Sequence, residues 1–227
     1  MIQTCIPTGV SALDSAMSGG INEGDSVLFV TENSIDGARL MQTLMLSLRE
    51  THKKTLYITS KKSAASLIDE LKNRCNISGE IESCILDAGV LAEDAVTHVL
   101  EKIAALPAGC VVFLDSLTSY LPFAELNFPL FFQKINKAMR DFSEKKIACI
   151  FMISAGALSR EHEVCFTDLF THIWRLKRVP AEDNTIRILS IESTFQDANL
   201  APREELQLSA SLLPDGTVEL VHLRKIR

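Results

Sequence analysis

The sequence has no long apolar run, no closely paired cysteines and no excess of positive charge, and each absence excludes a class of protein. No window approaches the ~18 consecutive apolar residues of a membrane span. The opening, MIQTCIPTGV, lacks the basic and apolar regions of a secretory signal. The six cysteines contain no C-x-x-C pair, and Cys110 and Cys149 lie in strongly apolar runs. We therefore expect a cytoplasmic protein with reduced, buried thiols and no membrane partner.

The net charge of the chain also argues against binding to nucleic acid. The net charge is −6, whereas nucleic-acid binders usually carry a basic stripe. The basic residues nearest to a cluster, Arg175, Lys177 and Arg178, alternate with apolar residues, which is typical of a solvated strand face. The segment 160–163, R-E-H-E, has a histidine between two glutamates but no C-x-x-C or second histidine that would complete a metal motif, so we expect a charged loop and no metal site.

Apolar runs that alternate with helical patterns fill the first two thirds of the chain. Strand-like runs without polar alternation, separated by helices, predict a parallel sheet covered on both faces. The expected strands are 26–30, 55–59, 83–86, 110–114 and 147–153, and the expected helices centre on 40–48, 64–71, 95–103 and 131–142. Functional loops are then expected at the carboxyl ends of the strands.

The pattern changes from about residue 171. Four further strands, 173–176, 186–191, 206–212 and 218–223, follow without intervening helices, and Pro214-Asp215-Gly216 predicts a turn between the last two. We expect one domain over residues 1–227, with a parallel core at about 8–155 and antiparallel strands at about 171–226. The fold class is α/β, three layers with a mostly parallel central sheet and an antiparallel carboxyl-terminal edge.

Three stretches resemble the KaiC-like members of the RecA superfamily of P-loop ATPases. Residues 8–14, T-G-V-S-A-L-D, are followed by G-G-I-N-E-G at 19–24, with the family's spacing and no gap. Residues 111–117, V-V-F-L-D-S-L, are similar to its Walker B strand, which often ends in Asp-Ser, here Asp115-Ser116. The resemblance covers roughly 8–177 and implies a RecA-like three-layer fold.

The stretch that aligns with the P-loop lacks the residues that bind phosphate. A P-loop needs glycines that free backbone N–H groups, a lysine for the β/γ oxygens and a hydroxyl for Mg²⁺. If Gly37 matches the second glycine, Glu32 replaces the first, Ala38 the lysine and Arg39 the hydroxyl residue. With Asp36, two carboxylates stand where a polyanion would bind. Arg39 could supply positive charge only by turning back from the helix.

The catalytic position that the family fills with acidic residues is basic here. The strand 55–59 is followed by Lys61-Lys62, and an ammonium group cannot act as the general base that a carboxylate can. Only Asp115 keeps the family's residue type, and a strand-end aspartate alone is weak evidence for metal. Glu32, Lys61 or Lys62, and Asp115 could form a salt-bridge cluster in the vacated pocket; the lysines could instead face water, or capture an anion such as a partner's carboxylate.

These substitutions favour a protein without ATPase activity. The sequence predicts a KaiC/RecA-like pseudo-ATPase that regulates or scaffolds through protein contacts, with no catalytic residue, metal or cofactor. The alternative is a nucleotide-binding ATPase with a remodelled P-loop that still takes ATP and Mg²⁺. The resemblance implies a homo-oligomer, or a hetero-oligomer with an active KaiC/RecA-like paralogue. The candidate residues of the vestigial nucleotide pocket are Glu32, Asp36, Gly37, Ala38, Arg39, Lys61, Lys62, Asp115 and Ser116.

Overall fold

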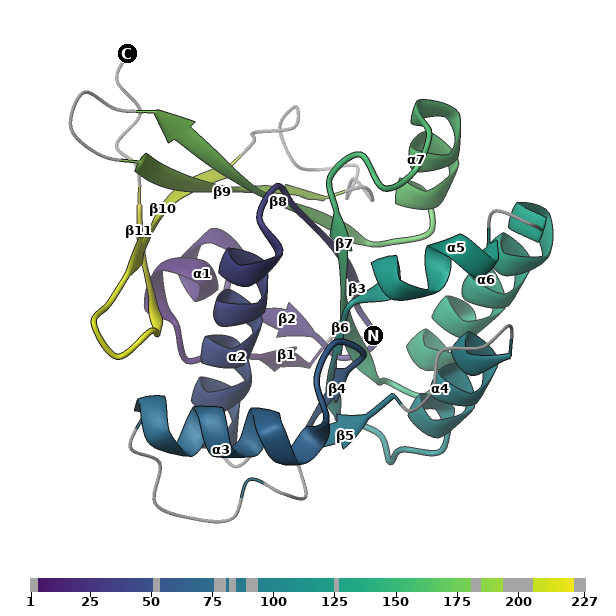
Figure 1. The fold of residues 1–227 in the computed structure, drawn as a ribbon, viewed down its shortest axis with the longest axis horizontal. Coiled ribbons are helices and arrows are strands. Elements are labelled where there is room, and N and C mark those ends of the chain that lie inside the picture. Colours follow the sequence, from purple (N-terminus) through teal and green to yellow (C-terminus); the bar gives the residue numbers. More distant parts are fainter. Residues whose placement is uncertain are drawn as a thin grey trace.

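A computed structural model gives the fold and describes residues 4–50, 54–75, 81, 85–88, 94–124, 127–180, 185–193 and 206–222. Its centre is a nine-stranded sheet in the order β11-β10-β9-β8-β3-β7-β6-β4-β5 (Figure 1). Helices cover both faces of the parallel part of this sheet. The expected fold class, a three-layer α/β arrangement with an antiparallel carboxyl-terminal edge, is confirmed.

Six neighbouring strands run parallel. They are β3 (Ser26–Thr31), β4 (Thr55–Thr59), β5 (Ile85–Asp87), β6 (Val111–Asp115), β7 (Ala148–Ser154) and β8 (His172–Pro180). Every residue of β3 and β6 is buried. Their continuous apolar runs arise because both faces of a parallel sheet lie under helices. Cys110 and Cys149 are buried, as predicted.

The remaining three strands form the antiparallel edge. They are β9 (Thr185–Ser193), β10 (Leu206–Leu212) and β11 (Val218–His222). β8 differs from the expectation for the carboxyl third, because it pairs parallel to β3 and antiparallel to β9. The turn predicted at 214–216 joins β10 to β11, with Gly216 at φ 77°.

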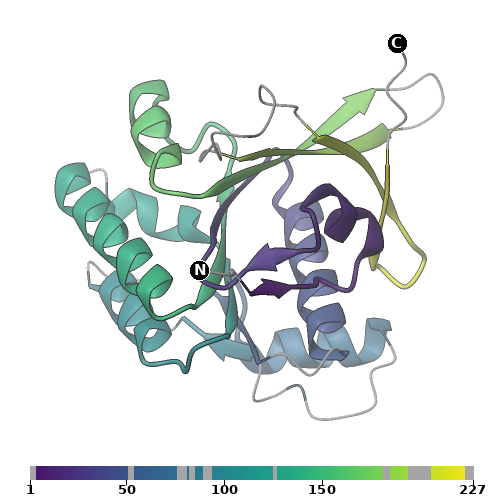
Figure 2. The same ribbon diagram turned by 180° about the vertical axis from the view of Figure 1, so that it is seen from behind.

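The helices form two layers, which Figures 1 and 2 show from opposite sides. α1 (Ser11–Ala16), α2 (Ser34–Glu50) and α3 (Ala64–Cys75) pack on one face, and the side chains of β9, β10 and β11 complete that core. The other face carries α4 (Ala95–Ala104), a 3₁₀ helix (Leu117–Tyr120), α5 (Leu121–Ala124), α6 (Phe128–Glu144) and α7 (Arg160–Thr167). In the described part of the chain, no helix has the length and apolarity that a membrane crossing requires.

The structure corrects the expected charged loop at 160–163, because these residues begin α7. Ser159 caps this helix by accepting a hydrogen bond from the His162 N–H, and Phe166 is buried beneath it. A single buried apolar residue in an eight-residue helix is too weak a periodic signal to predict it.

The T-G-V-S-A-L-D segment has a structural role at the entry to the domain. The Asp14 carboxylate accepts hydrogen bonds from the Thr8 N–H and hydroxyl at 2.6 and 2.7 Å, and from the Gly9 N–H at 3.2 Å. Gly20 lies between β1 (Cys5–Ile6) and β2 (Ile21–Asn22), where an added Cβ would stand 2.2 Å from the Ile6 carbonyl oxygen. These residues therefore fix the chain before β3.

Candidate functional site

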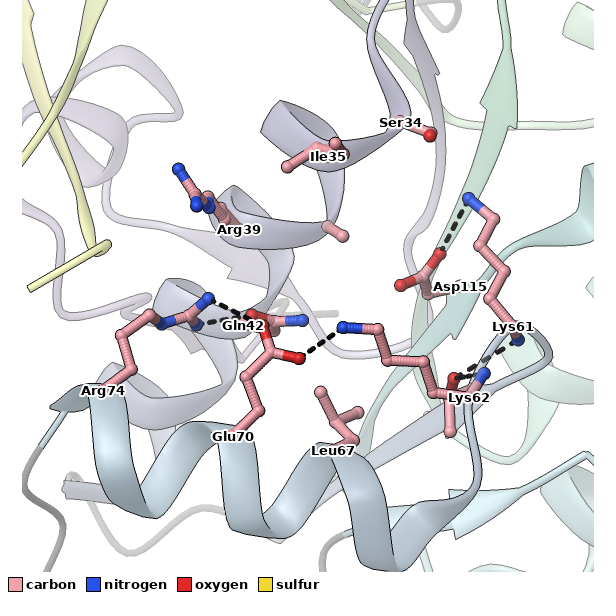
Figure 3. A pocket seen from close by; sticks show the side chains of 12 residues that line it. Ser34, Ile35, Arg39, Gln42, Lys61, Lys62, Leu67, Glu70, Arg74 and Asp115 are labelled. Atoms are coloured by element: carbon pink, nitrogen blue, oxygen red, sulfur yellow. Dashed lines mark hydrogen bonds and ion pairs between the residues drawn. The ribbon is translucent and has the colours of Figure 1, made fainter.

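Five of the nine sequence-predicted residues line a cleft at the carboxyl ends of β3, β4 and β6: Ala38, Arg39, Lys61, Lys62 and Asp115. The first two turns of α2, the β4–α3 loop, α3 and Asp115 enclose it (Figure 3). Its cavity volume is about 140 Å³, well below the roughly 300–1,000 Å³ of sites that hold drug-sized ligands. The lining residues are Ser34, Ile35, Ala38, Arg39, Gln42, Thr59, Lys61, Lys62, Leu67, Glu70, Arg74 and Asp115.

The segment between β3 and α2 caps the amino-terminal end of α2 through Asn33. Asn33 Oδ1 accepts hydrogen bonds from the N–H groups of Ile35 and Asp36, at 3.0 and 3.2 Å, and the Asn33 carbonyl accepts one from Gly37 N–H. An asparagine in this position starts a helix by satisfying its first amides. The N–H groups that a phosphate cradle would present are therefore already bonded within the protein.

Gly37 permits close packing of α2 on the sheet. A Cβ built there would lie 2.7 Å from Met152 Sδ and 2.8 Å from Thr31 Cγ2. Gly37 is not among the glycines with positive φ, so its role is to let helix and strand approach, not to form a left-handed turn.

Asp36 is buried and neutralised by two arginines from the antiparallel edge. Its Oδ2 accepts hydrogen bonds from Arg178 Nε of β8 at 2.7 Å and Arg187 Nε of β9 at 2.8 Å. Burial by itself would raise the pKa of Asp36, but the bonds from Arg178 and Arg187 outweigh it and lower the pKa below its ordinary value. The carboxylate is therefore ionised at neutral pH and joins α2 to two strands.

The structure places Glu32 away from the lysines. Its Oε2 accepts a hydrogen bond from Arg178 N–H at 3.0 Å, and its own N–H donates to the Leu176 carbonyl. Both contacts extend the pairing of β3 with β8 beyond the strand. Glu32, a lysine and Asp115 thus do not form a single cluster.

Lys61 and Asp115 are brought together. Lys61 Nζ lies 3.4 Å from Asp115 Oδ1, and Tyr57 hydroxyl donates to Asp115 Oδ2 at 2.7 Å. Burial and then the charge of Asp115 raise the pKa of Tyr57 well above its ordinary value, so the hydroxyl stays protonated and donates. Ser116 is fully buried, and its N–H donates to Ser60 Oγ at 2.9 Å. Oδ2 of Asp115 is therefore hydrogen-bonded, whereas the buried Oδ1 accepts no hydrogen bond among the described residues and has only the ion pair with Lys61.

Lys62 belongs to a second chain of contacts, between the β4–α3 loop and α2. Its Nζ pairs with Glu70, which also contacts Arg74 Nη1 at 3.3 Å. Arg74 Nη2 donates to Gln42 Oε1 of α2 at 2.6 Å, and Gln42 in turn bonds the Tyr57 hydroxyl. The lysines thus do not simply face water, although both side chains remain partly exposed.

The sequence analysis missed six contributors to this site: Gln42, Tyr57, Glu70, Arg74, Arg178 and Arg187. Arg178 and Arg187 lie 142 and 151 residues after Asp36, and the sequence pattern favours a solvated strand face for Arg178. Tyr57 and Gln42 fall on apolar patterns of a strand and a helix, and nothing in the sequence marks them as polar partners of the site. No local spacing could have indicated these contacts, because tertiary folding alone creates them.

The two histidines in and near the segment 160–163, His162 and His172, contact other side chains. The His162 ring stacks on Phe128 with centroids 3.7 Å apart, and His172 Nε2 lies 3.1 Å from Asp25 Oδ2. Across the residues that the structure describes, no three His, Cys, Asp or Glu side chains are grouped so that they could hold a metal ion.

We expect the replacement of Tyr57 by phenylalanine to destabilise the protein by about 1–3 kcal/mol, because it leaves one oxygen of the buried Asp115 carboxylate without its donor. Chemical denaturation of Y57F and wild type would measure the difference. The matched control is Tyr120→Phe, since the buried Tyr120 hydroxyl has no hydrogen-bond partner among the described residues and should lose little. Equal losses in the two variants would contradict the role given to Tyr57.

Comparisons with known proteins agree with this geometry at the level of the fold. A family model described as "Family of unknown function (DUF7125)" matches residues 5–215. The crystal structure of the flagellar accessory protein FlaH from Methanocaldococcus jannaschii is similar, with a TM-score of 0.72 and 15% identity over 97% of this chain and 100% of that chain. The likeness supports the RecA-like fold. No curated protein matches the sequence.

Proposed function

The chain belongs to this family of unknown function, and we propose that it is a non-catalytic RecA-like protein that regulates or scaffolds through contacts with other proteins. One observation carries the proposal: Asp36, which the resemblance aligns with the phosphate-binding loop, is buried and bonded to Arg178 and Arg187. Both guanidinium groups are therefore already paired with a carboxylate of the chain, and a phosphate group would have to displace that carboxylate to reach them.

The residues present do not fit Mg·ATP. Asn33 already accepts from the amides of the first helical turn, and Ala38 stands at the lysine position. Asp115 pairs with Lys61 and accepts a hydrogen bond from Tyr57, so a hydrated metal ion would have to displace the lysine to reach its carboxylate. In place of an acidic general base, the strand β4 is followed by lysine. We infer that these replacements make the pocket a structural element.

The remodelled nucleotide site remains the second candidate, because Arg39, Lys61 and Lys62 all line the pocket. Their charge could hold a phosphate group if the cap of α2 opened. For partners, we propose a homo-oligomer or a hetero-oligomer with an active RecA-like paralogue. Such assemblies use surface contacts and do not require hydrolysis in every subunit.

Isothermal titration with ATP and Mg²⁺, beside a thermal shift in the same buffer, tests the proposal. We expect no heat and no shift at millimolar nucleotide. A ligand at 100 times its Kd would add about 2.7 kcal/mol of stability, which a melting curve would show. Micromolar binding that R39Q weakens would overturn the proposal in favour of the remodelled site. Binding that R39Q leaves unchanged would overturn it too, and would place the nucleotide elsewhere.

A further inference from the structure

The pocket is a positively charged recess in an acidic protein. Four cationic side chains line it, Arg39, Lys61, Lys62 and Arg74, against two carboxylates, Glu70 and Asp115. The chain as a whole carries a net charge of −6. The excess positive charge of this recess is therefore complementary to acidic surfaces that the same chain has in abundance.

Arg39 is the cation in this recess that lacks an ion-pair partner among the described residues. Lys61 pairs with Asp115, while Lys62 and Arg74 share Glu70. Arg39 is half-buried and lines the recess from α2, with its guanidinium directed away from the Lys61–Asp115 pair (Figure 3). At about 140 Å³ and roughly 30 Å³ per water, the recess holds about as much as four or five waters, which suits one acidic side chain.

An exposed apolar side chain stands beside Arg39. Ile35 lies one helical turn earlier on the same face of α2 and is 62% exposed. An exposed isoleucine next to an arginine is typical of the centre of a protein contact, where apolar groups and arginine are enriched. A site for a free phosphate would gain nothing from Ile35.

A matching pair of side chains lies on α7. Val164 is 58% exposed and, with Ile35, is one of the two most exposed large apolar side chains of the described residues. Glu161, three residues earlier, is exposed and forms no ion pair with another described residue. His162 and Phe166 take the inner face of α7, against Phe128 and the core, so Glu161 and Val164 share the outer face.

The two surfaces lie at the edge formed by the carboxyl ends of the parallel strands, with α2 on one face of the sheet and α7 on the other. α2 begins after β3 and α7 follows β7, and these strands are parallel neighbours in the sheet. Two copies that meet through this edge about a two-fold axis would form both contacts at once, α2 of each copy against α7 of the other.

We propose that the pocket receives the Glu161 carboxylate of a second copy of this chain, with Ile35 packed against that copy's Val164, in a two-fold dimer. This inference deepens the proposed function and rests on it, since a bound nucleotide would compete for the recess. The Glu161 carboxylate pairs with the guanidinium of Arg39. The contact between Ile35 and Val164 removes both apolar side chains from water.

Sedimentation velocity over a range of concentrations tests the dimer. The wild type should sediment at twice the 25.1 kDa chain mass, and R39E and E161R should each weaken dimerisation about 30-fold or more, because each places like charges together in both symmetric contacts. The double variant R39E/E161R should regain the wild-type dissociation constant. The matched control R140E, on an exposed position near the end of α6, should behave as the wild type.

A wild type that remains a monomer at every concentration would overturn the proposal. Single variants that dimerise as tightly as the wild type, or a double variant that fails to regain affinity, would overturn it as well. The nucleotide titration separates this failure from that of the proposed function: a monomer that gives no heat with ATP rejects the dimer alone, whereas ATP binding rejects the non-catalytic protein whatever its mass.

Discussion

Replacing Asp36 by asparagine is expected to lower the free energy of unfolding by about 2 kcal/mol at pH 7. The asparagine keeps the size of the side chain but removes the charge that both Arg178 and Arg187 contact. Hydrogen bonds to charged groups contribute about 1.5–3 kcal/mol, and the burial of Asp36 limits compensation by water. Urea denaturation of D36N and wild type would measure the loss.

The loss should depend on pH in a defined direction. The pKa of Asp36 lies below its ordinary value of 3.8, so its stabilising contribution is complete above that pH and disappears as pH falls through the folded-state pKa. D36N lacks the contribution at every pH, so the difference between the two proteins should close below about pH 3.8. A difference that stays constant down to pH 2.5 would contradict the ion-pair interpretation.

Asp69→Asn is the matched control for this prediction. Asp69 is exposed on α3, and a surface substitution of this kind changes stability by at most about 0.5 kcal/mol. A loss in D69N as large as that in D36N would show that net charge, and not the contact with the two arginines, causes the effect.

Replacing Gly37 by valine is expected to destabilise the fold by about 3 kcal/mol. The Cβ alone would stand 2.7 Å from Met152 Sδ and 2.8 Å from Thr31 Cγ2, and the added methyl groups require more space. The methionine can move, but the β-branched Thr31 sits in the central strand β3 and cannot, so α2 must shift outward. Thermal unfolding followed by circular dichroism would measure the loss.

Ala38→Val provides the control at the next position of α2. It introduces the same β-branched side chain at a half-buried position that faces the pocket, so it should cost only the helix propensity, less than about 1 kcal/mol. Helix propensity alone would favour valine over glycine at position 37, which means that a stabilised G37V would directly contradict the close packing described above.

These predictions concern residues that the sequence placed in a nucleotide pocket and that the structure shows holding elements together. Asp36 connects α2 to β8 and β9, while Gly37 seats the same helix on β3 and β7. The Tyr57–Gln42–Arg74 contacts connect α2 to β4 and α3. The start of α2 is therefore fixed from three sides, a rigid arrangement that suits a surface for protein contacts more than a loop that must wrap around phosphates.

Much of the fold was predictable from the sequence because burial leaves a local signature. The apolar runs at 26–30, 55–59 and 110–114 are typical of strands covered on both faces, and the structure has β3, β4 and β6 there. The strand predicted at 83–86 falls partly outside the described residues, with β5 beginning at Ile85. The sequence pattern did not predict α7 because its single buried face is short. It did not predict the direction of β8 because parallel or antiparallel pairing depends on the neighbouring strand.

From the sequence, the resemblance predicts that Glu32, Asp36 and Ala38 stand in the phosphate-binding loop of an ATPase and that Lys61 stands at its catalytic position. The tertiary structure alone decided what those residues do. Asp36 accepts hydrogen bonds from arginines of β8 and β9, and Asp115 accepts one from the Tyr57 hydroxyl. Charges along a sequence show only which pairs are possible; a buried ion pair exists only where folding brings both partners within hydrogen-bond distance and removes the water between them.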